Sequence, residues 1–312
     1  MLPKKSGRPL KHGVNTNLRC RALNSALRYF VRPVIRISQS PERAKRVFDL
    51  VAPHLFRGPA HICHLDECVG GRKLHWISVG APQSRRVILY LHGGAYFTGS
   101  GVAYRGLAGH ISKATGLRVC LPDYRLLQDA PFPAAFDDAL QAWNYLLSIG
   151  YRPQDIVLGG DSAGGGLMLA LLAHLTQTAQ HPRAAFAMSP WTDLTLSGAS
   201  LQTKSEVLLP VSRMNDVVDR YLDGAPRNDP RASPLFARFD HPPPVLIQVS
   251  RDEALLDDAL RMGAVLGDAA DMRVWPDVPH VWQMFAGYIP QARSALAELG
   301  AFVQTSFESD NR

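Results

Sequence analysis

The sequence predicts an α/β protein with a mostly parallel β-sheet flanked by helices, and two observations support this class. Short apolar runs alternate along the chain with longer segments of helical periodicity. Most of these runs are bounded by Gly, Pro or Asp, as expected for strands that are buried on both faces of a parallel sheet. Strands that alternate with helices form βαβ units, whose crossover connections make neighbouring strands parallel.

Length and composition restrict the class of protein further. The chain has 312 residues, of which 46% are hydrophobic and 20% are charged, so it can bury a substantial core in one large domain. No stretch approaches the roughly 18 apolar residues of a membrane span, and four cysteines are too few for a disulfide scaffold. Arg21 and Arg28 interrupt the apolar region that a signal peptide would need. We therefore expect a soluble, cytoplasmic protein.

The net charge of +7 is concentrated near the N-terminus. Residues 1–46 hold twelve Lys or Arg and a single acid, Glu42, so the rest of the chain is mildly acidic. The chain shows no zinc-finger spacing and no interleaving of basic and aromatic residues, and a basic stretch of this kind is most often a solvated face. We expect no nucleic-acid partner and no stable membrane insertion, and the sequence leaves open whether the protein forms a homodimer.

Two helices are expected before the first strand. Apolar residues recur at helical spacing over residues 17–37, where Pro33 would kink or end the helix. Pro41 then opens a second helical pattern that continues to Val51. Two helices ahead of a sheet indicate a cap rather than a part of the sheet.

The remaining pattern defines the proposed domains. The predicted strands cover residues 74–79, 87–91, 117–121, 156–158, 184–188, 245–249 and 272–275. The predicted helices cover residues 106–115, 134–149, 163–178, 215–222, 253–266 and 290–303. We therefore expect a basic N-terminal arm and helical cap over residues 1–58 and a main domain over residues 59–312. Residues 194–240 contain no convincing strand, and we expect this excursion to contribute to the cap.

A run of potential metal ligands occupies residues 61–68. It contains His61, Cys63, His64, Asp66 and Cys68. The run lacks a second pair of ligands at the spacing typical of a zinc finger. We interpret it as part of two neighbouring strands that meet at a turn, and we predict no metal.

The strongest chemical motif is Gly160-Asp161-Ser162-Ala163-Gly164. It follows a predicted strand and opens a predicted helix, which is the context of a nucleophile elbow, a tight turn that exposes a serine hydroxyl. The N-terminus of the following helix directs amide groups at developing negative charge. Ser162 is therefore the candidate nucleophile of an acyl-transfer reaction.

A second motif, His92-Gly93-Gly94-Ala95, directly follows the predicted strand over residues 87–91. Acyl transfer develops an oxyanion that needs preorganised N–H donors, and adjacent glycines leave such donors unobstructed. The sequence predicts an oxyanion hole formed by the amides of Gly93, Gly94 and Ala163. We expect His92 to be a structural hydrogen-bonding residue beside it.

A serine nucleophile needs a base, and in this arrangement the base follows the nucleophile in the chain. His174 lies three turns along the helix that Ser162 opens, whereas His181 and His241 precede strands. His280 follows the predicted strand over residues 272–275, at the edge where sites assemble in open α/β sheets. His280 is therefore the predicted base.

The acid that orients this base is predicted to be Asp252, just beyond the strand over residues 245–249. Its role is to hold the tautomer of His280 and to stabilise the imidazolium. Glu253, Asp257 and Asp258 compete, but we expect them in the first turns of the following helix. Asp277 is too close to His280 in sequence to orient it easily.

At these residues the chain resembles the bacterial hormone-sensitive-lipase-like (family IV) carboxylesterases of the α/β-hydrolase fold, over roughly residues 60–305. Further matching motifs are Asp123-Tyr124-Arg125-Leu126, Pro131-Phe132-Pro133-Ala134-Ala135, Ser189-Pro190-Trp191-Thr192-Asp193-Leu194, and Asp252-Glu253-Ala254-Leu255-Leu256-Asp257. The resemblance implies an eight-stranded core, an N-terminal helical cap over the acyl pocket, and hydrolysis of short-to-medium acyl esters without metal or cofactor. This family usually has a third glycine where this chain has Ala95.

The expected chemistry is that of a serine carboxylesterase with a small acyl ester as its substrate. We take Tyr96, Phe97, Asp161 and Trp191 as candidate residues of the substrate pocket. Two other activities remain open, namely an amidase or acyltransferase with the same triad, and a non-catalytic small-molecule-binding relative. The N-terminal helix is interpreted as a lid over the active site, with membrane binding by its Arg-rich face as the alternative.

Overall fold

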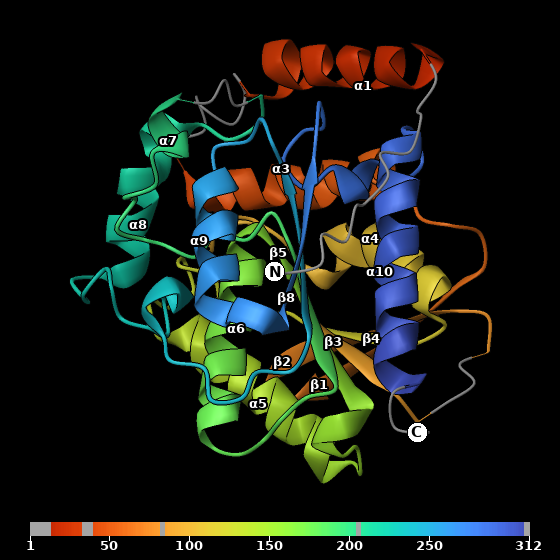
Figure 1. Ribbon diagram of the computed structural model, residues 1–312, viewed down its shortest axis with the longest axis vertical. Helices are drawn as coiled ribbons and strands as arrows, with labels where there is room; N and C mark the ends of the chain where they lie inside the picture. The colour runs from red at the N-terminus through yellow and green to blue at the C-terminus, as the bar shows by residue number, and fades with distance from the viewer. Residues whose placement is uncertain (1–13, 33–39, 82–84, 204–206, 309–312) are drawn as a thin grey trace, which may run out of the picture.

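An eight-stranded sheet forms the centre of the molecule, and helices cover both of its faces (Figure 1). The computed structural model describes residues 14–32, 40–81, 85–203 and 207–308. The strand order is β1-β2-β4-β3-β5-β6-β7-β8. β1 and β2 pair antiparallel, as do β2 and β4, and every other neighbouring pair is parallel. The predicted α/β class with a mostly parallel sheet is confirmed.

The strands and longer helices follow the sequence pattern closely. The strands are β1 (Ile62–Val69), β2 (Arg72–Val79), β3 (Val87–Leu91), β4 (Arg118–Pro122), β5 (Ile156–Asp161), β6 (Ala184–Met188), β7 (Val245–Ser250) and β8 (Ala270–Trp275). The helices are α1 (Val14–Ala26), α3 (Pro41–Leu55), α4 (Gly101–Thr115), α5 (Ala134–Ser148), α6 (Ser162–Gln177), α7 (Ser200–Thr203), α8 (Met214–Leu222), α9 (Leu256–Leu266) and α10 (Pro290–Glu308). β1 and β2 form the hairpin expected around residues 61–68. α9 begins three residues later than predicted, which changes the active site described below.

The sheet separates two hydrophobic cores, and β3 shows how its side chains divide between them. Val87, Leu89 and Leu91 belong to the core that contains buried residues of α5, α6 and α9. Ile88 and Tyr90 belong to the core that contains buried residues of α4 and α10. Successive side chains of a strand point to opposite faces, so a fully apolar strand such as β3 supplies both cores. This explains why the central strands read as continuous apolar runs.

The parallel strands bring four loops to one edge of the sheet. β3, β5, β7 and β8 run in the same direction, so their carboxyl ends meet at the same edge. The loops that follow them carry residues 92–95, Ser162, residues 251–253 and His280. The fold therefore gathers the motifs that the sequence analysis singled out.

The N-terminal helices lie beyond this edge of the sheet, with α1 outermost and α3 beneath it (Figure 1). α1 is followed by a short π-helix, η1 (Leu27–Val31), instead of continuing as one α-helix. The kink or end expected at Pro33 lies outside the described residues. Cys20 Sγ donates to the carbonyl oxygen of Asp277 at 2.9 Å, and Asn24 Nδ2 donates to the same oxygen at 3.2 Å.

Residues 194–240 form an excursion that contains no strand among its described residues, as predicted. It includes α7 and α8. α8 packs back on the main domain, where the ring of Tyr221 stacks on Tyr96 with a centroid separation of 3.9 Å.

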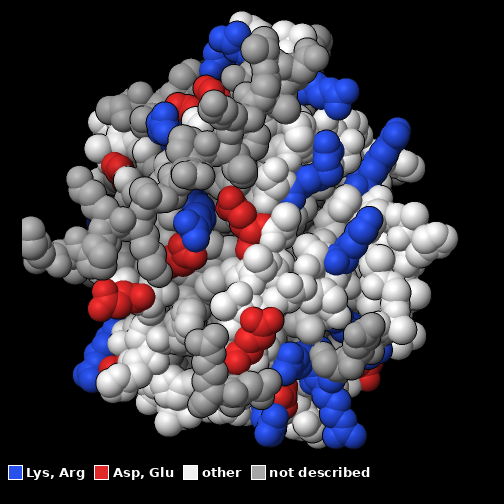
Figure 2. Space-filling model, turned by 45° about the vertical axis from the view of Figure 1, so that its right-hand side comes forward, with Lys and Arg blue, Asp and Glu red and all other residues white. Residues whose placement is uncertain are grey.

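The described surface carries charges of both signs. On the face drawn in Figure 2, Lys and Arg side chains are spread out, and acidic side chains lie between several of them. Among the described helices, none combines the length and the apolar character needed to cross a membrane.

Candidate active site

Ser162 lies at a sharp turn between β5 and α6. Its φ angle is +50°, an uncommon backbone conformation for a residue with a side chain. The flanking glycines allow the turn, because a Cβ at Gly160 would lie 2.4 Å from the carbonyl oxygen of Gly164 and a Cβ at Gly164 would lie 2.2 Å from that of His92. The local geometry is that of the predicted nucleophile elbow.

His280 lies against this serine. Its Nε2 atom is 2.9 Å from Ser162 Oγ, and its Nδ1 atom is 3.2 Å from Glu253 Oε1. A carboxylate only accepts hydrogen bonds, so Nδ1 carries the proton and Nε2 is left to accept the proton of the serine hydroxyl. All three side chains are buried. Glu253, His280 and Ser162 thus form one hydrogen-bonded line, in the chain order Ser, acid, His.

The sequence prediction of Asp252 as the orienting acid is wrong, because the structure places Glu253 in that position. Asp252 is exposed, and its Oδ2 accepts a hydrogen bond from the Asp277 amide at 3.0 Å. We expected Glu253 in the first turn of a helix, but α9 begins only at Leu256. Glu253 therefore lies in the turn after β7, where its side chain reaches back toward the sheet edge and His280.

Ser189 is a site residue that the sequence analysis quoted in a motif but gave no role. Its hydroxyl donates to Glu253 Oε2 at 2.7 Å and accepts from the Val281 amide at 3.2 Å. The Ser250 amide donates to the same Glu253 oxygen at 3.0 Å. These contacts fix the carboxylate and tie it to the residue after His280. Ser189 follows β6 directly, a position that pointed to this edge of the sheet.

The predicted oxyanion hole needs one correction. The Gly93 amide donates to Asp161 Oδ1 at 2.9 Å, so it is not directed at a substrate. Within the described residues, the amides of Gly94 and Ala95 donate no hydrogen bond, and the Ala163 amide lies in the first turn of α6, which has no intrahelical acceptor. Among the described amides of these two turns, those of Gly94, Ala95 and Ala163 therefore donate no hydrogen bond.

Asp161 does not line a pocket as expected but lies buried behind the turn over residues 92–95. Its Oδ1 accepts from Tyr90 Oη at 2.7 Å and from the Gly93 amide, and its Oδ2 accepts from Tyr104 Oη at 3.0 Å. Burial raises the pKa of Asp161 to about 6, although the hydrogen bonds from Tyr90, Gly93 and Tyr104 oppose this shift. This carboxylate joins β3, α4 and the nucleophile elbow.

His92 is structural, as predicted. Its Nδ1 atom lies 2.8 Å from the Gly93 carbonyl oxygen, its ring stacks on Tyr124, and its own carbonyl oxygen accepts a hydrogen bond from Tyr124 Oη at 2.5 Å. The ring is buried and lies apart from the line that joins Ser162 to Glu253.

Two of the aromatic pocket candidates, Tyr96 and Trp191, lie against the start of α6. Tyr96 and Trp191 are buried, Phe97 is half-buried, and the Trp191 amide donates to the Ser162 carbonyl at 2.9 Å. Tyr96 also stacks on Tyr221 of α8. These rings form closed packing beside the nucleophile.

An open cleft leads to His280 from the side of α1. Its lining combines the loop over residues 277–280 and the pair Asp252 and Glu253 with residues of the N-terminal segment: Arg21, Asn24, Ser25, Arg28 and Tyr29. The N-terminal segment therefore forms one wall of the cleft beside His280.

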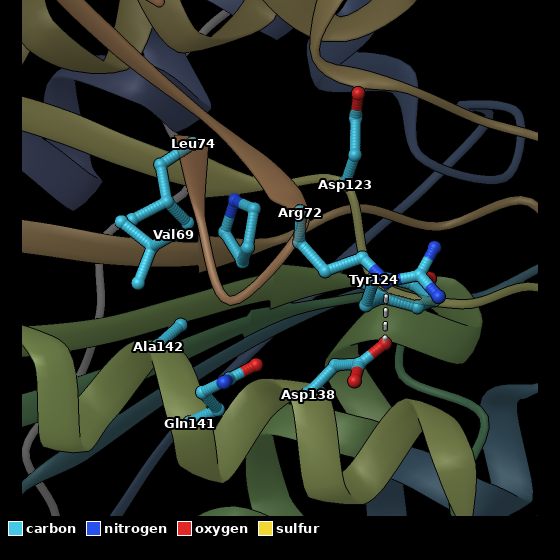
Figure 3. Close-up of a pocket in the computed structure, with 9 residues that line it drawn as sticks. Val69, Arg72, Leu74, Asp123, Tyr124, Asp138, Gln141 and Ala142 are labelled. Atoms are coloured by element: carbon cyan, nitrogen blue, oxygen red, sulfur yellow. Dashed lines mark ion pairs between the residues drawn. The ribbon is translucent and has the colours of Figure 1, made fainter. Parts of the chain in front are cut away.

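A second, smaller hollow lies between β2, α5 and the segment that follows β4 (Figure 3). Arg72 and Asp138 form an ion pair of 3.8 Å across it, and Arg125 makes a bidentate pair with the same carboxylate. Neither Ser162, Glu253 nor His280 lines this hollow, so it is separate from the candidate active site.

The titration of Asp161 leads to a test of the buried network. Because the folded pKa is about 6 and the ordinary value is 3.8, the folded state binds more protons between these values. The resulting stabilisation is complete below about pH 4 and is lost as the pH rises through 6. We expect Asp161→Asn to remove this slope, which amounts to roughly 2–3 kcal/mol, when urea unfolding is measured from pH 4 to 7. Parallel pH profiles for the two proteins would contradict the assignment.

Comparison with known proteins shows the family of the chain. Residues 88–284 match a family model described as the alpha/beta hydrolase fold. The chain is 38% identical over 244 residues to an acetyl-hydrolase of Streptomyces hygroscopicus, covering 76% of this chain and 81% of that protein. It is 36% identical over 233 residues to an esterase of Acinetobacter venetianus, covering 72% and 76% respectively.

A solved structure is similar over almost the whole chain. The crystal structure of an esterase from the bacterial hormone-sensitive lipase family superposes with a TM-score of 0.85 at 34% identity, covering 95% of this chain and 99% of that one. The chain therefore belongs to the α/β-hydrolase family, within it to the bacterial hormone-sensitive-lipase-like esterases, and is a carboxylic ester hydrolase.

Proposed function

We propose that the protein is a serine carboxylesterase that hydrolyses short-to-medium acyl esters through a Ser162–His280–Glu253 triad and an acyl-enzyme intermediate. The observation that supports this most directly is the hydrogen-bonded line from Glu253 through His280 to Ser162 at an open cleft. The similarity to an acetyl-hydrolase supports a small acyl group.

The mechanism follows from the proton positions. Ser162 Oγ attacks the ester carbonyl carbon while His280 Nε2 takes the hydroxyl proton, and Glu253 stabilises the resulting imidazolium through Nδ1–H. The tetrahedral intermediate then collapses, and Nε2–H protonates the departing alcohol. Water enters next, gives its proton to Nε2 and attacks the acyl-enzyme, and the second collapse returns the proton to Ser162 and releases the acid.

The negative oxygen of each tetrahedral intermediate is assigned to the amides of Gly94, Ala95 and Ala163. The Gly93 amide is committed to Asp161, so the next two amides of the turn are the ones available to an oxyanion. Removing one donor from such a hole costs about 2.7–4 kcal/mol of transition-state stabilisation. Ala95 has a φ angle of +52°, so its backbone adopts a conformation that a glycine in its place would also accept.

The N-terminal segment is proposed to act as a cap that limits the acyl group. α1 is hydrogen-bonded to the Asp277 carbonyl, three residues from His280, and its side chains line the entrance. Leu27 is buried in the same core as Ala52 and Phe56 at the end of α3, which anchors the segment. The rings of Tyr96, Trp191 and Tyr221 close the opposite side.

The proposal is tested first with p-nitrophenyl esters from acetate to palmitate. We expect turnover to be highest for the short-to-medium esters and to be blocked by a serine-directed phosphonate. Ser162→Ala removes the nucleophile, so kcat falls roughly 10⁶-fold while circular dichroism shows an unchanged fold. Turnover of Ser162→Ala near the wild-type rate excludes the assignment, and phosphonate labelling of an enzyme inactive on all these esters indicates an amide or acyl-transfer substrate instead.

The assignment of Glu253 as the acid is tested by changing each of two neighbouring carboxylates, Glu253 and Asp252, to the corresponding side-chain amide. Glu253→Gln keeps the shape of the side chain but favours the wrong tautomer of His280, so we expect kcat on p-nitrophenyl acetate to fall by about 10³–10⁴. Asp252→Asn is the matched control, and its kcat stays near the wild-type value because Asp252 contacts the Asp277 amide. If Asp252→Asn lowered kcat strongly and Glu253→Gln did not, the acid would be Asp252 and the assignment of Glu253 would be wrong.

The cap is tested through two leucines of the N-terminal segment. Leu27→Ser loses about 2 kcal/mol of apolar burial and loosens the segment, so the ratio of kcat/KM for decanoate over acetate esters rises by about tenfold. Leu18→Ser is the control, because Leu18 is 67% exposed. An unchanged ratio for Leu27→Ser, combined with lost binding to anionic liposomes, favours a membrane-binding role for the segment.

A further inference from the structure

Three potential metal ligands meet on the hairpin formed by β1 and β2. His64 and Asp66 are two residues apart on β1 and so share a face, and His75 of β2 is the register partner of Asp66. The His64 Nε2 atom lies 3.2 Å from His75 Nδ1 and 2.6 Å from Asp66 Oδ1, and His75 Nδ1 lies 2.7 Å from the same oxygen. We call these three residues the His–Asp cluster.

The spacing of the three donor atoms is close to that of a tetrahedral metal site. With metal–ligand bonds of about 2.0–2.1 Å, neighbouring ligand atoms of a tetrahedron lie about 3.3 Å apart. The distance between the two histidine nitrogens is 3.2 Å. The carboxylate lies nearer, but the Asp66 side chain is 43% exposed and can move outward by a fraction of an ångström. Imidazole nitrogen and carboxylate oxygen are established ligands of zinc.

A second carboxylate fixes the orientation of His75. Asp123 Oδ2 is 2.9 Å from His75 Nε2, and Asp123 Oδ1 accepts a hydrogen bond from the Gly101 amide at 2.7 Å. Metal-bound histidines commonly donate their other ring N–H to a carboxylate held in this way. In such an arrangement Nε2 donates to Asp123, and the lone pair of Nδ1 is available to a metal ion.

Three donor atoms therefore converge at one point of the hairpin. His64 Nε2 and His75 Nδ1 both lie within 2.7 Å of Asp66 Oδ1, while Asp123 holds the far side of the His75 ring. The two carboxylates alone would be enough to hold the His75 ring, so the donor atom that His64 adds at the same point is the feature that favours a metal site.

We propose that His64, Asp66 and His75 form a binding site for one divalent metal ion of the zinc type, with Asp123 as the residue that positions His75 and with the fourth position open to water. None of these residues belongs to the triad, so the site is independent of the proposed ester hydrolysis. The spacing of residues 61–68 gave no second ligand pair, and the strand register supplies His75 instead.

The effect of the metal is expected to be structural. His75 packs against the start of α4, where a Cβ at Gly101 would lie 1.9 Å from its ring. Asp123 precedes Tyr124, whose hydroxyl holds the His92 carbonyl beside the proposed oxyanion turn. A metal ion would therefore fasten the hairpin to α4 and to the segment after β4.

The test begins with metal-stripped full-length protein titrated with Zn²⁺ in a calorimeter, and with Co²⁺ in an absorption spectrometer. We expect one ion per chain, and visible Co²⁺ bands of the intensity typical of tetrahedral coordination. His64→Gln and Asp66→Asn each remove one ligand and lower Zn²⁺ affinity by at least about 10–100-fold. His54→Gln, an exposed histidine of α3, leaves the affinity unchanged.

Two further variants separate the cluster from other sources of binding. Cys63 and Cys68 are exposed on the same hairpin, and the Cys63→Ser/Cys68→Ser double variant is expected to bind Zn²⁺ as the wild type does. Arg105 Nη1 lies 3.5 Å from His64 Nδ1, where its charge opposes a cation, so Arg105→Gln should tighten binding. A purely structural hydrogen bond at this position would give no such gain.

The proposal is overturned if the wild type binds no Zn²⁺, or if His64→Gln and Asp66→Asn bind it as tightly as the wild type. The first result assigns the cluster to a protonated His75 held between two carboxylates. Circular dichroism and p-nitrophenyl acetate turnover, measured on each variant without metal, show that the fold and the triad are intact, so the outcome is separable from any failure of the esterase proposal.

Discussion

The hydrogen bonds to the Asp161 carboxylate hold the two halves of the active site together. Tyr90 belongs to β3, Gly93 to the turn after β3, and Tyr104 to α4, and all three donate to this one side chain. Asp161 directly precedes Ser162, so the proposed oxyanion donors are fixed relative to the proposed nucleophile. A buried carboxylate is costly unless several donors compensate it, and each donor here also anchors a separate element.

Much of the fold was predictable because its signals are local. Apolar runs bounded by Gly, Pro or Asp marked seven of the eight strands within a few residues, and the turn around Ser162 is encoded by adjacent glycines. His280 was also found locally, because it follows a strand that ends at the correct edge of the sheet. Such features depend on a few neighbouring residues and on the direction of parallel strands.

The predictions were wrong where a shift of one residue along the chain changes which side chain or amide makes a contact. Asp252 and Glu253 are adjacent, and only the length of the turn before Leu256 determines which of them faces His280. In the same way, the motif after β3 offers three consecutive amides, and the tertiary contact of Gly93 with Asp161 decides which of them remain free. The pairing of His75 with Asp66 likewise follows from the hairpin register, which the ligand spacing along the chain does not contain.

Because the residues of the proposed triad lie at the ends of different strands, ester turnover depends on the assembly of the whole sheet. Ser162 and His280 lie 118 residues apart in sequence, and the segments between them include β6, β7, β8 and the excursion over residues 194–240. A contiguous fragment must span all of residues 162–280 to carry both the proposed nucleophile and its proposed base. Ester turnover therefore reports on long-range chain assembly, because we expect it to return during refolding only when β6 has paired with β5 and β7 and β8 have extended the sheet beyond β6.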